Sequence, residues 1–364
     1  MTISDVSKNN TANHKSPLMF EDLLIQEQAA LQTLKPTVSK VFVTGAGGFL
    51  GKTICKRLRA ADIDVVGFAR GSYPELTAMG VTMIQGDIAD YDSLYAAMQD
   101  CDLVFHVASK AGVWGSRESY FDPNVNGTAN IIRACKALDI KRLVYTSTPS
   151  VTFAGEDEAG INESAPYAEK FLNYYGHSKA IAEKMVLNAN TSEFKTTALR
   201  PHLIWGPEDP HLVPRVIERA KIGKLKLVGK QDKLVDTIYV DNAAYAHILA
   251  ANDLNAAANS AGKAYFLSND EPITMAAMLN KILACVDIAP VTKRVPAGVA
   301  YTAGVVLETV YGLLKKQQEP IMTRFVARQL STCHYFDISA AKQDFGYQAL
   351  INIDEGMKRL KQSL

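Results

Sequence analysis

A glycine-rich turn between an apolar run and a helical pattern constrains the fold of this chain more than any other feature. In the run KVFVTGAGGFLG, which begins at Lys40, one glycine ends a buried strand and others follow at intervals of three residues. A turn without side chains lets the backbone approach a pyrophosphate, and the next helix directs its free N–H groups and positive dipole end toward it. Leucine takes the place of the last glycine of G-x-G-x-x-G, but the same physical logic applies. The run predicts a dinucleotide site at Gly45, Gly48, Phe49, Leu50 and Gly51.

Strands and helices alternate as far as residue 206. Apolar strand patterns occupy 64–70, 81–87, 103–109, 142–148 and 196–206, with helical patterns between most of them. This order is typical of parallel β-α-β units, so we expect an α/β fold with a doubly wound parallel sheet of the Rossmann type. Beyond residue 206 the alternation loosens. We therefore divide the chain into an N-terminal extension (1–38), a dinucleotide-binding domain (39–206) and a mixed α/β substrate-binding lobe with some return to the first domain (207–364).

The first 38 residues differ in character from the rest. A polar segment rich in Ser, Asn, Thr and Lys is expected to be disordered. Apolar residues at helical spacing follow it and predict a short amphipathic helix: Phe20, Leu23, Leu24, Ala30, Leu31 and Leu34. This helix either folds back on its own domain, which is the favoured interpretation, or docks a partner. The opening residues lack the apolar segment of a secretory signal, which favours a cytoplasmic protein.

Charge and cysteine usage argue against several classes of function. The formal net charge is +1, which gives no general electrostatic reason to bind nucleic acid. The five cysteines form no C-x-x-C pair, which argues against a disulfide framework and a metal site. The longest apolar stretch, Val295–Leu314, contains Glu308 and several glycines and falls short of a transmembrane segment.

The end of the second strand predicts the cofactor. An acidic residue there would accept from the ribose 2′-hydroxyl of NAD, but the strand ends Ala69-Arg70 with no acid. A guanidinium suits a 2′-phosphate, so NADP(H) is favoured over NAD. Three residues that follow the third strand or lie in the fourth are also expected at the cofactor: Asp87, Ile88 and Ala108. The alternative role of Asp87 is that of helix N-cap or turn residue.

A tyrosine and a lysine four residues apart, Tyr175 and Lys179, lie on one face of the helix predicted over 175–190. A free phenol has a pKa of about 10, and a neighbouring ammonium is expected to lower this pKa by stabilising the phenolate. Tyr174 is the weaker candidate, because the residue four places after it is Ser178. The sequence therefore predicts that Tyr175 transfers a proton. Lys179 is also expected to hold the ribose of the cofactor.

Two strand ends complete the predicted site. Thr148 or Ser147, after the strand at 142–148, is placed to hydrogen-bond a substrate oxygen. Pro201 and Leu203, at the end of the next strand, are expected against the nicotinamide ring. His202 lies between them and is interpreted as a structural or substrate-contacting histidine, because a tyrosine already serves as the acid–base group.

Eight motifs in order resemble those of the extended short-chain dehydrogenases/reductases over roughly residues 40–350: TGAGGFLG, GDI, HVAS, NVNGT, YTST, YGHSK, LRPHLIWGP and VDTIYVDN. Within that superfamily the chain is similar to the 3β-hydroxysteroid dehydrogenase group, through EPIMTRF and YFDISAAKQDFGY. Three longer runs resemble the 2-alkyl-3-oxoalkanoate reductases of bacterial long-chain olefin biosynthesis: HVASKAGVWG, YTSTPSVTF and RPHLIWGPEDPHL. Thr148 stands where the superfamily usually has serine.

The resemblance implies reduction of a long-chain 2-alkyl-3-oxoalkanoate by NADPH. Tyr175 would deliver the proton, Thr148 and Ser147 would position the oxygen, and Lys179 would support Tyr175. It also implies a homodimer and other olefin-pathway enzymes as partners. The apolar stretch 295–314 would then be a lid over two alkyl chains, with a core helix or a membrane-surface contact as alternatives. The rival functions are a sterol or steroid 3β-dehydrogenase, a sugar-nucleotide epimerase and a non-catalytic cofactor-binding scaffold.

Overall fold

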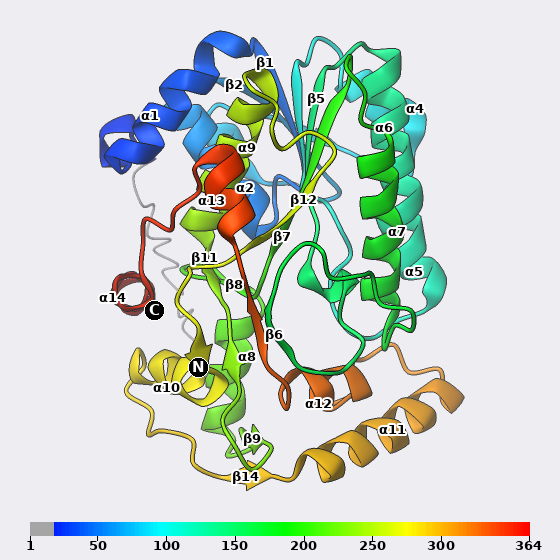
Figure 1. Cartoon of the computed structure of the whole chain (residues 1–364), viewed down its shortest axis with the longest axis vertical. Coiled ribbons are helices and arrows are strands. Elements are labelled where there is room, and N and C mark those ends of the chain that lie inside the picture. The colour runs from blue at the N-terminus through cyan, green and yellow to red at the C-terminus, as the bar shows by residue number, and fades with distance from the viewer. Residues whose placement is uncertain (1–17) are drawn as a thin grey trace, which may run out of the picture.

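The computed structural model describes residues 18–364, and its centre is a seven-stranded parallel sheet (Figure 1). The strand order is β12-β7-β5-β4-β1-β2-β3, and every neighbouring pair is parallel. The bounds are Lys40–Thr44 (β1), Asp64–Ala69 (β2), Thr82–Gln85 (β3), Leu103–His106 (β4), Arg142–Thr146 (β5), Lys195–Pro201 (β7) and Ala264–Leu267 (β12). The predicted doubly wound sheet is confirmed. The disorder predicted for the polar start of the chain falls mainly on residues 1–17, which lie outside the described part.

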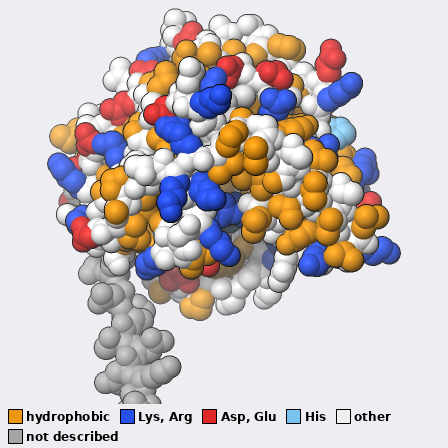
Figure 2. Space-filling view, turned by 90° about the horizontal axis from the view of Figure 1, so that it is seen from below, with side chains coloured by type: hydrophobic (Ala, Val, Ile, Leu, Met, Phe, Trp, Pro, Cys, Tyr) orange, Lys and Arg blue, Asp and Glu red, His pale blue; other side chains and the backbone are white. Residues whose placement is uncertain are grey.

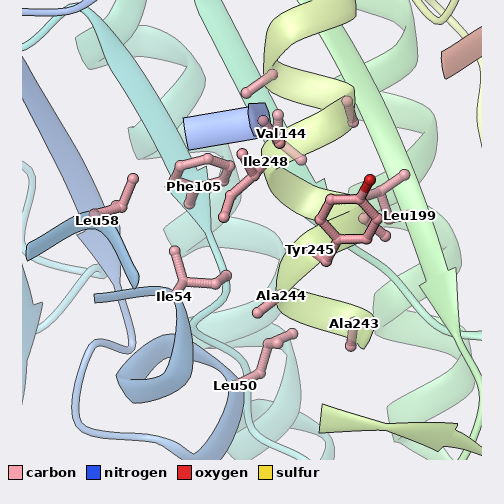
Figure 3. Packing of buried hydrophobic residues seen from close by; sticks show 14 of the residues in the cluster. Leu50, Ile54, Leu58, Phe105, Val144, Leu199, Ala243, Ala244, Tyr245 and Ile248 are labelled. Atoms are coloured by element: carbon pink, nitrogen blue, oxygen red, sulfur yellow. The ribbon is translucent and has the colours of Figure 1, made fainter. Parts of the chain in front are cut away.

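Helices cover both faces of the sheet (Figure 1). One layer contains α1 (Ile25–Leu34), α2 (Phe49–Ala60), α9 (Val240–Asn255) and α13 (Ser339–Phe345). The other contains α4 (Tyr91–Ala97), α5 (Arg117–Phe121), α6 (Gly127–Ala137) and α7 (Tyr174–Asn188), and the short α3 (Pro74–Ala78) precedes β3. Figure 3 shows Leu50 and Ile54 of α2 and Ile248 of α9 packed toward Phe105 of the sheet, all of them buried. This packing fixes the start of α2 at the carboxyl ends of the strands.

The N-terminal extension folds back on its own domain, as the favoured interpretation predicted. Helix α1 packs on α9 and buries Ala30, Leu31 and Leu34. Its Glu27 accepts a hydrogen bond from Arg57 of α2 at 2.7 Å, and Asp241 of α9 lies 2.9 Å from the same guanidinium. Glu27 and Arg57 are both buried, so the loss of either would leave an unpaired charge in the interior. The helix is therefore an integral part of the domain.

The remaining elements form a lobe next to the carboxyl ends of the main sheet (Figure 1). It contains a four-stranded sheet in the order β13-β10-β15-β6 and the strand pairs β11-β8 and β14-β9. The strands are Glu158–Ile161 (β6), Ile204–Trp205 (β8), Leu227–Val228 (β9), Leu234–Val235 (β10), Ile238–Tyr239 (β11), Ile273–Thr274 (β13), Arg294–Val295 (β14) and His334–Phe336 (β15). The helices are Leu212–Lys221 (α8), Met275–Ala284 (α10), Ala297–Leu313 (α11), Arg324–Gln329 (α12) and Ile353–Ser363 (α14).

The boundary predicted at residue 206 does not divide the chain into two separate units. Strand β12 is the edge strand of the main sheet and pairs with β7, although it lies beyond the boundary. Helix α9 belongs to the helical layer of the first domain, and β6 of the first half pairs with β15 in the lobe. The predicted return to the first domain is thus large. β12 has only four residues, and its sequence pattern does not reveal which sheet it joins.

Helix α11 lies at the periphery of the lobe, packed against α12. Ala300 and Gly304 are its buried residues, whereas Val299, Val306 and Leu313 are exposed. The interpretation of 295–314 as an ordinary core helix is therefore wrong. Gly304 brings the helix backbone close to the segment before α12, while Val299, Val306 and Leu313 stay outside this contact.

Candidate active site

One cavity of about 520 Å³ opens at the carboxyl ends of the parallel strands. This volume is within the range usual for small-molecule sites, about 300–1,000 Å³. Fourteen of the fifteen predicted site residues line it: Gly45, Gly48, Phe49, Leu50, Gly51, Arg70, Asp87, Ile88, Ala108, Ser147, Thr148, Tyr175, Pro201 and Leu203. Residues from seven separate segments thus meet in one place, as expected for a ligand site at the end of an open α/β sheet.

The glycine-rich turn has no room for side chains. A Cβ atom at Gly51 would lie 2.2 Å from the carbonyl oxygen of Gly45, and one at Gly45 would lie 2.9 Å from the Cα atom of Ala108. Gly45 also has a φ of +66°, which a residue with a side chain rarely adopts. The turn therefore packs against the end of β4, and the N-terminus of α2 opens on the cavity. These features fit a pyrophosphate held by backbone N–H groups.

The end of β2 brings Arg70 to the same cavity. Its guanidinium is exposed, and its backbone carbonyl accepts from the Gln85 side chain at 2.8 Å. Asp87 also lines the cavity, and its carboxylate accepts from the backbone N–H of Ala89 at 3.0 Å, so it is a turn residue as well. Tyr73 lines the cavity and was missed by the sequence analysis. Tyr73 lies beside the glycine-rich turn because the loop after β2 folds over that turn, which the sequence does not reveal.

The three hydroxyl groups expected at the reacting centre lie together. Burial raises the pKa of Tyr175 above its ordinary value of 10, and interaction with the Thr148 side chain acts in the opposite direction. Ser147 is buried, and no other described group hydrogen-bonds to its hydroxyl. Its backbone N–H donates to Leu199 at 2.6 Å, which fixes the residue in place. A buried hydroxyl without a partner is costly, and a ligand oxygen in the cavity would satisfy it.

Lys179 is the predicted site residue that does not line the cavity. It is buried, and its ammonium donates to the carbonyl oxygen of Thr146 at 2.6 Å and lies 4.1 Å from the centroid of the Tyr145 ring. Burial lowers the pKa of Lys179 to about 7, against the opposing effect of Glu183. The expectation that Lys179 lowers the pKa of Tyr175 is wrong for this structure. The reason is that burial dominates for both groups and the ammonium is directed at a backbone carbonyl.

A π-helical turn at Asp122–Asn126 places Asn124, which the sequence analysis did not single out. Its side-chain N–H groups donate to the carbonyl of Lys110 at 3.1 Å and to the Ser178 hydroxyl at 2.9 Å, and its oxygen accepts from the N–H of Lys110 at 2.7 Å. Asn124 therefore connects the loop after β4 to the helix that carries Tyr175 and Lys179. Single π-helical turns are frequent at functional sites, but no local pattern in NVNGT predicts this one.

His106 also escaped prediction. Its ring lies between the hydroxyls of Thr44 (2.8 Å) and Thr128 (2.9 Å), and burial lowers its pKa to about 3. Thr44 accepts from the N–H groups of Val107 and Ala108, so its own hydrogen is free to point at the histidine. The neutral ring thus fixes the end of β4 against the glycine-rich turn.

His202 is a structural histidine, one of the two roles predicted for it. It does not line the cavity, its ring lies 2.7 Å from the carbonyl oxygen of Asp236, and burial lowers its pKa to about 3. The neighbouring Leu203 lines the cavity with a φ of +48°, in the left-handed region that side-chain residues seldom adopt. Tyr174, the weaker tyrosine candidate, is 44% exposed.

The loop after β4 joins the cavity to α11. Lys110 lines the cavity, and its ammonium donates to the Ser119 hydroxyl at 2.7 Å. Four residues later, the Trp114 ring packs edge-on against Tyr311 of α11, and its indole N–H donates to the carbonyl of Lys316 at 2.9 Å. Among the described residues that line the cavity, none belongs to α11. The helix therefore contacts the loop that carries Lys110, but it contributes no residue to the cavity wall.

A family described as the 3-beta hydroxysteroid dehydrogenase/isomerase family matches residues 42–293. The chain belongs to this family. The predicted resemblance is confirmed, and the protein is a nicotinamide-dependent oxidoreductase of the short-chain dehydrogenase/reductase type. The match includes the glycine-rich turn and the tyrosine–lysine helix, and it ends just before α11.

The proteins similar to this chain carry names that imply different substrates. A 2-alkyl-3-oxoalkanoate reductase from Shewanella oneidensis is 70% identical over 347 residues, which cover 93% of this chain and 90% of the relative. The human sterol-4-alpha-carboxylate 3-dehydrogenase, decarboxylating, is 36% identical over 329 residues, covering 88% and 87%. A crystal structure of the UDP-glucose 4-epimerase of Thermus thermophilus with NAD superimposes with a TM-score of 0.69 at 23% identity, covering 89% and 98%. The last similarity shows the fold alone.

Proposed function

We propose that this protein uses NADPH to reduce a long-chain 2-alkyl-3-oxoalkanoate to the 2-alkyl-3-hydroxyalkanoate in the biosynthesis of olefins. The observation that carries the chemistry is the cavity in which Tyr175 meets Thr148 and the unpaired hydroxyl of Ser147. The substrate class is supported by the 70% identity to a reductase of that name.

Reduction requires a hydride on the carbonyl carbon and a proton on the carbonyl oxygen. The nicotinamide cofactor supplies the hydride when it is bound. Tyr175 delivers the proton, and its raised pKa keeps it protonated near neutral pH, which is the form that a proton donor needs. The hydroxyls of Ser147 and Thr148 donate to the same oxygen and hold it beside Tyr175.

The preference for NADPH is supported by Arg70. It lines the cavity, its guanidinium is exposed, and no ion pair to another described residue engages it. A planar guanidinium binds a phosphate with two parallel hydrogen bonds, whereas a 2′-hydroxyl offers it little. β2 ends without an acidic residue that would favour NAD.

The substrates named for the two relatives, an oxoalkanoate and a sterol carboxylate, both carry a carboxylate on the carbon next to the reacting carbon. In a 2-alkyl-3-oxoalkanoate the carboxyl carbon is attached to C2 beside the C3 carbonyl, and a sterol-4-carboxylate carries its carboxylate beside C3. Of the described Lys and Arg residues, Arg70 and Lys110 line the cavity, and Arg70 lies at the end of β2. We therefore assign Lys110 as the cation that holds the substrate carboxylate.

The test is NADPH oxidation with a racemic long-chain 2-alkyl-3-oxoalkanoic acid, compared with NADH, and the reverse reaction on the more stable hydroxy acid. Tyr175→Phe should abolish turnover while NADPH still binds, and the matched Tyr174→Phe should turn over normally. A sterol 3β-dehydrogenase is the second candidate, favoured by the 36% identical relative. Turnover of a 3β-hydroxysterol-4-carboxylate, without turnover of the alkyl substrate, would establish that function instead.

A further inference from the structure

A stripe of apolar side chains runs along the outer side of α11. Val299, Ala303, Val306, Val310 and Leu313 follow one another at intervals of four and three residues, so they lie on one face of the helix. All five are exposed, with 58% of Val299, 54% of Val306 and 79% of Leu313 accessible to solvent. Figure 2, which views the molecule from the side where α11 lies, shows hydrophobic side chains gathered on this surface. Contiguous exposed apolar surface of this kind marks an interaction site.

The inner side of α11 holds the stripe in this orientation. A Cβ atom at Gly304 would lie 2.6 Å from the carbonyl carbon of Thr323, so the helix and the segment before α12 are in direct backbone contact. Glu308, the charged residue of the helix, accepts from the backbone N–H and from the guanidinium of Arg324, both at 2.6 Å. The exposure of the stripe is therefore a consequence of fixed packing.

Basic residues surround the stripe. The pairing of β9 with β14 brings the segment 221–230 beside the residues that lead into α11. Together, 221–230 and 293–316 carry eight basic residues and one acidic residue, Glu308, whereas the whole chain has a net charge of +1. The basic residues are Lys221, Lys224, Lys226, Lys230, Lys293, Arg294, Lys315 and Lys316. Arg294 is paired with Asp232, and the seven lysines are exposed. Figure 2 shows Lys and Arg side chains next to the hydrophobic group.

We propose that α11 is a docking surface for an anionic lipid bilayer, with the apolar stripe in the lipid interface and the lysines at the headgroups. An apolar helix face flanked by lysines has the chemistry of interfacial membrane contacts, in which both elements add to the affinity. A twofold contact between two copies would oppose one cationic surface to another, which the charge distribution disfavours. No described helix is both long and apolar enough to cross a membrane. This surface is independent of the substrate proposed above.

The experiment is co-sedimentation of the full chain with vesicles of phosphatidylglycerol and phosphatidylcholine, and with phosphatidylcholine alone. Binding to the anionic vesicles should weaken with rising salt. The double variant Val306→Glu/Val310→Glu should lower the partition coefficient about tenfold or more, because it places two carboxylates in the lipid interface. Ile25→Glu replaces an apolar residue that is 80% exposed on α1 and should bind as the parent protein does.

A second variant tests the lysines separately. Lys224→Gln/Lys226→Gln should reduce binding to anionic vesicles by about thirtyfold, because each lysine near the headgroups contributes about 1 kcal/mol. Circular dichroism and cofactor binding of each variant show that the fold is intact. The absence of vesicle binding by the parent protein would overturn the proposal. So would a dimer of the parent chain that Val306→Glu/Val310→Glu converts to a monomer without any effect of lipid.

Discussion

Replacing Lys179 by methionine should stabilise the cofactor-free protein. The fold lowers the pKa of this lysine from an ordinary value of 10.5 to about 7, chiefly by burial. Each unit of pKa is worth about 1.4 kcal/mol, so at pH 7.5 the buried lysine costs about 4 kcal/mol. Methionine avoids this cost but forfeits the hydrogen bond to Thr146, worth about 1–2 kcal/mol. The net expectation for Lys179→Met is an increase in the free energy of unfolding of about 2 kcal/mol.

The dependence on pH gives the sharper test. A lysine whose pKa is lowered in the folded state penalises folding fully below about pH 7, and the penalty fades as the pH rises toward 10.5. The advantage of Lys179→Met over the parent protein should therefore shrink by about 2 kcal/mol between pH 7.5 and pH 9, measured by urea unfolding without cofactor. Lys184→Met, at an exposed position on the same helix, should change the stability by less than about 0.5 kcal/mol at both pH values. A gap that does not vary with pH would refute the reasoning.

Three further predictions concern the cavity. Arg70→Ser should lower kcat/KM for NADPH about tenfold to a hundredfold and leave kcat/KM for NADH nearly unchanged, and an equal loss with both cofactors would contradict the assigned role. Gly51→Ala places a methyl group 2.2 Å from a carbonyl oxygen and should weaken NADPH binding about tenfold or more by calorimetry, whereas Gly312→Ala, with nothing within 4 Å, should bind normally. Asn124→Ala should lower kcat about tenfold with little change in the affinity for NADPH, because it loosens the helix of Tyr175 but leaves the glycine-rich turn intact; unchanged kcat would show that the hydrogen bonds are only structural.

Much of the fold and site could be predicted because the signals are local. A buried strand, a glycine-rich turn and a helix follow one another within 21 residues at the start of the sheet. The spacing of Tyr175 and Lys179 is a property of one helix, and the hydroxyls at 147 and 148 end one strand. Parallel strands bring such ends together, so the sequence order alone places them in one cavity.

The remainder depends on contacts between distant segments. Asn124 matters because Lys110 and Ser178 fold against it, and Tyr73 because its loop turns back on the glycine-rich segment. The pKa of Lys179 depends on the surroundings that bury it, which spacing cannot reveal. Likewise, the composition of 295–314 left a lid, a core helix and a membrane-surface contact open, and only the packing of Gly304 against Thr323 shows which side of α11 faces outward.

The contact between Trp114 and α11 gives the molecule an intrinsic optical reporter. The chain contains two tryptophans. Trp205 is fully buried and its indole N–H donates to the Thr237 hydroxyl at 3.1 Å, so its fluorescence should be insensitive to events at the surface. Trp114 is partly exposed, and its indole N–H donates to the carbonyl of Lys316, three residues beyond the end of α11. A spectral shift on adding vesicles would thus report on the contact between Trp114 and the end of α11, and its time course could be followed without any label.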